Sequence, residues 1–204
     1  MLTNKTKKYF ILAGIVGPIG YFALLVTLGL LWSGYNPILQ SMSEIGGVES
    51  PFKNIMNIFG FSLLGILIAL FALGWQKTFP KNLIIKISSL LLLVAGFFMF
   101  LVGFFPCDAA CIDVTTTGQL HSFTSTIPSI AMPLAAMLSA LYLAKAWGKR
   151  WGYLSFYLGL LSMASGPIMF IPAAEAYVGL IQRVGIGLSL LWMLLMAIKI
   201  LRKN

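Results

Sequence analysis

The chain has 204 residues, of which 59% are hydrophobic and only 9% are charged. Soluble domains carry roughly 25% charged residues, so this composition excludes a water-soluble domain and predicts an integral membrane protein. The net charge of +9 does not indicate nucleic-acid binding, because the basic residues lie in short segments between apolar runs, where such residues set membrane topology.

Six apolar runs each approach the roughly 20 residues that a helix needs to cross a bilayer. We expect membrane-spanning helices over residues 9–32, 51–75, 84–105, 117–144, 151–171 and 177–200. The first run is too long for the apolar part of a signal peptide, and no small-residue cleavage site follows it. The predicted fold is all-α, an integral membrane bundle of six transmembrane helices forming one domain over residues 1–204.

The charged residues predict how the helices are oriented. With both termini in the cytoplasm, the inner segments hold every basic residue, Lys203 among them, except Lys53 and Arg183. The outer segments then hold all five acidic residues, which are Glu44, Glu49, Asp108, Asp113 and Glu175. Because lysine and arginine accumulate on the cytoplasmic side, we expect an N-in/C-in, multi-pass protein of a prokaryotic cell membrane.

The first outer loop, residues 33–50, has the pattern of a short helix. Asn36-Pro37 is typical of a helix start, and Gly46-Gly47 of a helix end. Four apolar residues recur between them at helical spacing, namely Ile38, Leu39, Met42 and Ile45. We therefore expect a short interfacial helix in this loop.

Two pairs of polar residues lie inside predicted spans. Asn54 and Asn57 are three residues apart and would share one helix face. Asparagine is costly against lipid, so this face should point into the bundle, for interhelical hydrogen bonding or for a ligand. Gln182 and Arg183 lie about two turns inside the last span.

Arg183 has three interpretations. Its guanidinium could pair with Asp108, Glu44 or Glu175 and so lock the last helix to a loop. It could contact an anion such as a lipid phosphate, which the fork of guanidinium donors suits. It could also extend to the membrane surface.

Residues 106–121 contain both cysteines and the only histidine. Cys107 and Cys111 lie on the predicted outer side, where oxidising conditions favour a disulfide that staples the loop. A redox role is the weaker alternative, because redox sites usually use the tighter C-x-x-C spacing.

His121 is a hydrogen-bonded structural residue or a general acid–base. In the second case Ser43, Ser41 or Ser125 would be the nucleophile and Asp108 would orient the imidazole. His121, Asp108 and Glu44 could supply three metal ligands, but no metal-binding spacing supports such a site, so we expect no metal or other cofactor.

Aromatic residues near the predicted span ends fit interfacial belts. They are Trp32, Trp75, Trp147, Trp151 and Tyr177.

Several short motifs resemble a known family. They are residues 35–37, 40–46, 50–51 and 57–60, then Phe105-Pro106-Cys107-Asp108 and Gly118-Gln119-Leu120-His121. Together they resemble the first two outer loops and the adjoining helices of domain-of-unknown-function family 998. That family is similar in layout to the Frag1/DRAM/Sfk1 membrane proteins. Those proteins have a serine-acid-x-glycine loop, and Ser43-Glu44-Ile45-Gly46 would correspond to it in this sequence. The resemblance implies six spans and, through the distant relatives, a role connected with membrane lipids.

These observations lead to three hypotheses. The first is a non-enzymatic protein with an outward-opening polar pocket that binds a lipid headgroup or small amphiphile. The second is an intramembrane lipid hydrolase using Ser43, His121 and Asp108, and the third is a small-molecule transporter. The pocket hypothesis assigns ligand binding to Ser41, Glu44, Asn54, Asn57, Ser125, Gln182 and Arg183. Membrane lipids are the expected partners. A homodimer is a further possibility, because the glycine-rich helix faces could pack within one chain or between two chains.

Overall fold

A computed structural model describes residues 4–202, so Lys203 lies outside the described residues. Every element assigned within them is helical. The long helices are α1 (Asn4–Leu31), α3 (Leu63–Thr78), α4 (Leu83–Val102), α5 (Thr116–Ala146), α6 (Lys149–Ile168) and α7 (Val178–Leu201). The short elements are η1 (Ser43–Gly46), α2 (Lys53–Ile55), the π-helix η2 (Met56–Ser62), η3 (Ala109–Cys111) and η4 (Pro172–Tyr177).

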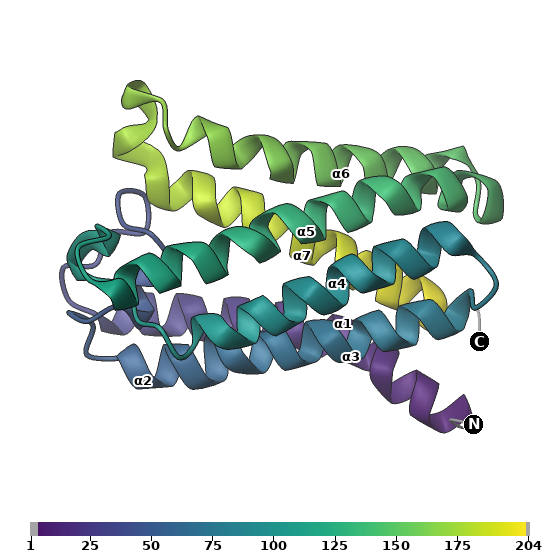
Figure 1. The fold of residues 1–204 in the computed structure, drawn as a ribbon, viewed down its shortest axis with the longest axis horizontal. Helices are drawn as coiled ribbons and strands as arrows, with labels where there is room; N and C mark the ends of the chain where they lie inside the picture. The colour runs from purple at the N-terminus through teal and green to yellow at the C-terminus, as the bar shows by residue number, and fades with distance from the viewer. Residues whose placement is uncertain (1–3, 203–204) are drawn as a thin grey trace.

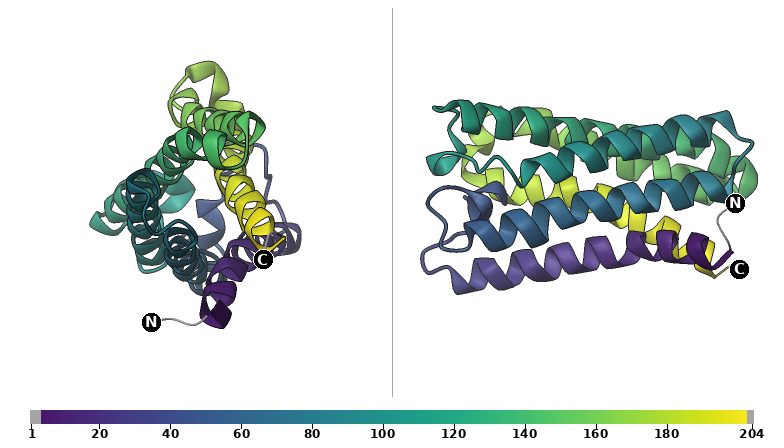
Figure 2. Two further views of the ribbon diagram at one scale, coloured as in Figure 1. Left: turned by 90° about the vertical axis from the view of Figure 1, so that its right-hand side faces the viewer. Right: turned by 60° about the horizontal axis from the view of Figure 1, so that its bottom comes forward.

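The six long helices run side by side as one elongated bundle (Figure 1). Each packs against its neighbour in chain order, and α7 packs back against α1, which closes the ring. Both chain ends lie at one end of the bundle, which we call the proximal end (Figures 1 and 2). The opposite, distal end carries the loops predicted to face outward.

Within residues 4–202, five helical segments are long and apolar enough to cross a membrane. They are Lys5–Leu31, Lys53–Thr78, Leu83–Val102, Thr116–Ala146 and Pro172–Leu201. The 20-residue helix α6 is not among them, although it packs along both α5 and α7. The predicted multi-pass helical membrane protein is thus supported, whereas the sixth span and the orientation are not decided by these helices.

Small and weakly polar side chains join the helices to one another. The Ser88 and Ser139 hydroxyls lie 2.8 Å apart between α4 and α5, and those of Ser162 and Ser189 lie 2.8 Å apart between α6 and α7. The Ser89 hydroxyl donates to the Ala72 carbonyl at 2.6 Å, from α4 to α3. Such bonds and close packing hold helices together in lipid, where burying apolar surface gives little driving force.

The expected interfacial helix in the first outer loop is wrong in extent and in direction. Residues 37–42 form turns, and only Ser43–Gly46 make a single 3-10 turn, η1. Met42 and Ile45 are 1% and 0% exposed, because they pack into the end of the bundle rather than onto a membrane surface. Of the four spaced apolar residues, only Met42 and Ile45 belong to the core, whereas Ile38 and Leu39 are exposed.

Candidate functional site at the distal end

Arg183 holds the first outer loop against α7. Its Nη1 donates to the carbonyl oxygens of Pro37 at 2.6 Å, Gln40 at 3.0 Å and Gly179 at 2.8 Å. Its Nη2 donates to the Tyr35 hydroxyl, and the guanidinium carbon lies 5.6 Å from the centroid of the Tyr35 ring. Arg183 is therefore bound by backbone carbonyls and a phenol, where the sequence suggested a carboxylate or phosphate.

Two neighbouring positions on α7 strengthen the same contact. The Gln182 Oε1 accepts a 2.6 Å hydrogen bond from the Met42 backbone N–H, and the Leu180 N–H donates to the Ile38 carbonyl at 3.1 Å. A Cβ at Gly179 would stand 2.1 Å from the Gln40 carbonyl oxygen, so this close approach requires glycine. Gln182 and Arg183, both predicted as ligand-binding residues, thus position the loop.

Ser41 and Glu44 form a reciprocal cap around η1. The Glu44 carboxylate accepts from the Ser41 backbone N–H at 2.7 Å, while the Ser41 Oγ accepts from the Glu44 backbone N–H at 3.3 Å. This is the capping-box arrangement of a serine and a glutamate three residues apart. The second carboxylate oxygen accepts from the Gln40 amide at 2.8 Å, so Glu44 is held within the loop.

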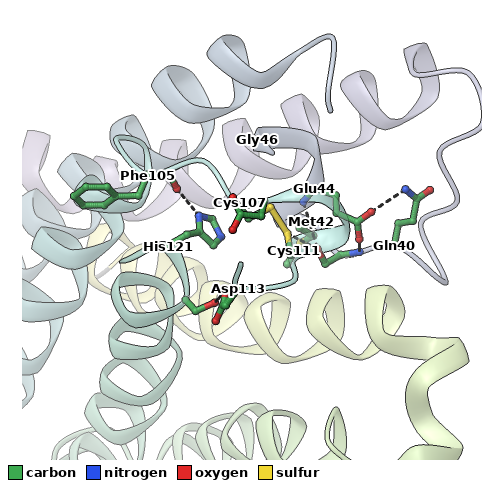
Figure 3. Close-up of a disulfide and its surroundings, with 12 residues drawn as sticks. Gln40, Met42, Glu44, Gly46, Phe105, Cys107, Cys111, Asp113 and His121 are labelled. Carbon is green, nitrogen blue, oxygen red and sulfur yellow. Dashed lines mark hydrogen bonds between the residues drawn. A yellow bond between two sulfur atoms is a disulfide. The ribbon is translucent and has the colours of Figure 1, made fainter. Parts of the chain in front are cut away.

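A disulfide staples the second outer loop, and two hydrogen bonds join this loop to the first. The Cys107 and Cys111 sulfurs lie 2.14 Å apart, which confirms the predicted staple (Figure 3). The Ser41 hydroxyl donates to the Cys111 Sγ at 3.5 Å, and the Val48 N–H donates to the Cys107 carbonyl at 3.0 Å. We call residues 33–50 and 106–115 together the distal cap.

Asp108 organises the entry into α5. Its carboxylate accepts from the backbone N–H of Thr115 at 2.7 Å, the Thr115 hydroxyl at 2.8 Å and the Val114 N–H at 3.0 Å. The Thr115 side chain in turn caps α5 by accepting from the Gly118 N–H. The hydrogen bonds from Thr115, first its backbone N–H and then its hydroxyl, hold the pKa of Asp108 below its ordinary value.

Asp108→Ala should lower the melting temperature at pH 7, and this loss should disappear in acid. Because the folded pKa is below the ordinary value of about 4, the ionised carboxylate stabilises the fold above that value and loses this effect as pH falls through the folded pKa. Melting curves from pH 7 to 3 check this, with the exposed Glu49→Ala as the control. A difference from wild type that is independent of pH would contradict the assignment.

His121 is buried, with 3% of its surface exposed, beneath the distal cap. Its Nδ1 lies 2.6 Å from the Phe105 carbonyl oxygen, which can only accept, so Nδ1 carries the proton (Figure 3). The ring packs edge-to-face on Phe61, with 6.3 Å between centroids. Its Nε2 is buried without a hydrogen-bond partner, and in the neutral ring this atom is an acceptor.

Asn57, in η2, also has one polar atom bonded to a backbone carbonyl and a second one buried without a partner. It is 5% exposed, its Nδ2 donates to the Gly46 carbonyl at 3.0 Å, and its Oδ1 is buried without a partner. Asn54, by contrast, is exposed, so the prediction that both asparagines point into the bundle is wrong for Asn54. Asn57 belongs to the π-helix η2, whose wider turn breaks the spacing that the prediction assumed.

The structure does not assemble the predicted hydrolase triad among residues 4–202. The Nδ1 of His121 bonds Phe105, while the carboxylate of Asp108 bonds Val114 and Thr115. Ser43 is buried in η1, and the Ser125 hydroxyl donates to the Ser122 carbonyl of its own helix. No set of three histidine, cysteine, aspartate or glutamate side chains in this range could hold a metal ion.

These features describe a multi-pass helical bundle. Its distal loops fold into a cap that is held by hydrogen bonds and contains one disulfide. Residues 15–199 match the model of the family described as protein of unknown function DUF998, and the chain belongs to that family, as its motifs indicated. No curated protein and no solved structure matches the chain.

Sequence reasoning missed the partners that hold the cap in place. Tyr35 lies in a loop with no pattern linking it to Arg183, 148 residues away. The other partners are backbone carbonyls, at Pro37, Gln40 and Phe105, which any residue type supplies. Only Thr115 carried a usable signal, since a threonine just before a helix is a common N-cap.

Proposed function

We propose that the protein crosses the membrane six times with both termini in the cytoplasm. Helix α6 would be the sixth span, since it packs against both α5 and α7 at the edge of the bundle and runs alongside them (Figure 1). An even number of spans also fits the position of both chain ends at the proximal end (Figure 2). The loops and helix ends there carry Lys77, Lys81, Lys145 and Lys149, as expected of a cytoplasmic side.

A fusion of green fluorescent protein to the C-terminus should fluoresce in a bacterial host, and a fusion of periplasmic alkaline phosphatase there should be inactive. Fusions after Glu49 give the opposite pattern if the distal end is outside. An active phosphatase at the C-terminus would reverse the orientation.

We further propose that the distal end binds an amphiphile whose head group donates hydrogen bonds, such as an amine-bearing lipid. The observation that carries this is the pair of buried acceptors, His121 Nε2 and Asn57 Oδ1, left without donors. Buried polar atoms almost always find a partner, and one that does not needs an explanation such as a water, ion or ligand. Both residues border Phe61, at the floor of the distal cap.

The chemistry of this floor favours a donor over an anion. Both free atoms are acceptors, and Arg183 already donates to the cap. The predicted outer side also carries all five acidic residues against Lys53 and Arg183. This differs from the sequence-based expectation of a phosphate held by Arg183. Entry of a head group requires η1 to move away from the floor.

Phosphatidylethanolamine and phosphatidylcholine test this proposal, because they share a phosphate and differ in their N–H donors. Phosphatidylethanolamine should raise the melting temperature of the detergent-purified protein above the value with phosphatidylcholine. Asn57→Leu should abolish that difference, whereas the exposed Asn54→Leu, three residues earlier, should keep it.

Equal stabilisation by the two lipids in the wild type would end the proposal of a donor head group. A difference that survives in both Asn57→Leu and His121→Phe would place the ligand elsewhere. The melting temperature of each variant is compared between the two lipids. A general loss of stability lowers both values and therefore does not change their difference.

A further inference from the structure

The proximal end carries an open cavity that the distal site does not explain. It has a volume of about 420 Å³, within the range of pockets that hold small molecules or head groups. The loop between α3 and α4 supplies most of its wall, and α5 supplies Tyr142. The lining residues are Thr78, Phe79, Pro80, Lys81, Asn82 and Tyr142.

Three polar side chains of this lining can donate hydrogen bonds, whereas the Thr78 hydroxyl already donates to the Gly74 carbonyl. Lys81 is exposed and supplies an ammonium group, and Tyr142 supplies a hydroxyl. The Asn82 Oδ1 accepts from the Ile85 N–H and so caps α4, which leaves its amide N–H₂ as the donor of that side chain. The carboxamide therefore adds donors beside the positive end of a 20-residue helix. No acidic side chain lines the cavity.

The wall of the cavity is aromatic and fixed. Phe79 packs edge-to-face on Tyr142 at 5.1 Å and on Trp75 at 5.5 Å between centroids. Trp75 was expected in an interfacial belt but is 0% exposed, and its indole N–H is buried without a partner behind Phe79. The site thus joins a packed aromatic wall to a group of donors.

We propose that this cavity binds the anionic phosphate head of a phospholipid in the membrane leaflet at the proximal end. A lipid is the favoured source because the cavity lies at the proximal end of α3, α4 and α5, where these helices would leave the membrane, with an aromatic wall for the glycerol and upper acyl region. Basic pockets between transmembrane helices recognise such head groups through charge and hydrogen bonding. The neighbouring Lys77, Lys86 and Lys145 give this end the matching positive field.

Native mass spectrometry of the full chain tests the proposal. Protein released from mixed micelles of phosphatidylglycerol and phosphatidylcholine should retain phosphatidylglycerol at least 5-fold more than phosphatidylcholine, on the order of 1 kcal/mol. Lys81→Gln should remove most of that preference, and Tyr142→Phe, which keeps the ring against Phe79, should reduce it. Lys149→Gln is the matched control, a lysine of the same end that does not line the cavity.

An equal loss in Lys81→Gln and Lys149→Gln would overturn the proposal, because it would show only diffuse attraction between charges. An unchanged preference in Lys81→Gln and Tyr142→Phe together would do the same. Inorganic phosphate that displaces phosphatidylglycerol at millimolar concentration would identify free phosphate, and not the lipid, as the ligand. Asn57→Leu should leave this preference intact, so the distal and proximal proposals fail separately.

Discussion

Arg183→Ala should destabilise the protein by about 3 kcal/mol or more, because hydrogen bonds to a charged group contribute roughly 1.5–3 kcal/mol each. The change removes the donors to Pro37, Gln40 and Gly179 and to the Tyr35 hydroxyl. The contacts to Gln40 and Gly179 are partly buried, whereas the contact to Pro37 is exposed, so the first two should account for most of the loss. A fall in melting temperature of roughly 6–12 °C in detergent is expected for this size of chain.

Arg183→Lys separates charge from geometry. A lysine keeps the positive charge but cannot direct two nitrogens at the carbonyls and the phenol at once, so it should recover less than half of the loss. Full recovery by lysine would show that charge alone matters. If Arg183→Ala left the melting temperature unchanged, this result would contradict the role of Arg183 in holding the first outer loop.

Gly65→Ala should be the most damaging small substitution within the bundle. A Cβ at Gly65 would stand 2.3 Å from the Phe100 nitrogen and 2.5 Å from the Gly96 carbonyl oxygen, both backbone atoms of α4. Backbone atoms cannot move aside as a flexible side chain can, so α3 and α4 would have to separate. Overpacking costs typically 1–3 kcal/mol and sometimes more, and we expect about 3 kcal/mol here.

Gly20→Ala is the matched control for this prediction. A Cβ at Gly20 meets nothing within 4 Å, so the same added methyl group should leave the melting temperature unchanged or slightly higher. Thermal unfolding in one detergent compares the two variants directly. Equal effects would mean that the close contact between α3 and α4 does not limit stability.

The candidate site residues divide into those that are bonded within the distal cap and those that keep one polar atom without a partner. Ser41, Glu44, Asp108, Gln182 and Arg183 all form hydrogen bonds within the protein, so their role in the structure is to close the distal end. His121 and Asn57 each use one polar atom in the same way and keep a second one free. This second atom is why the proposed ligand is a hydrogen-bond donor.

The membrane class, the number of long helices and the disulfide could all be predicted from the amino-acid sequence. These follow from local quantities: the length of an apolar run, the charges between runs, and two cysteines four residues apart. The short motifs also indicated the family, and the family model matches residues 15–199.

The partners of the polar residues, by contrast, depend on how the helices and loops pack in three dimensions. Arg183 could have met a carboxylate, a phosphate or water, and its partners are carbonyls 143 and 146 residues away, which carry no sequence signal. Asn54 and Asn57 looked equivalent until a π-helix turned one outward and buried the other. In an apolar chain each polar group is costly to leave unpaired, and its partner is set by how the helices pack rather than by its neighbours in sequence.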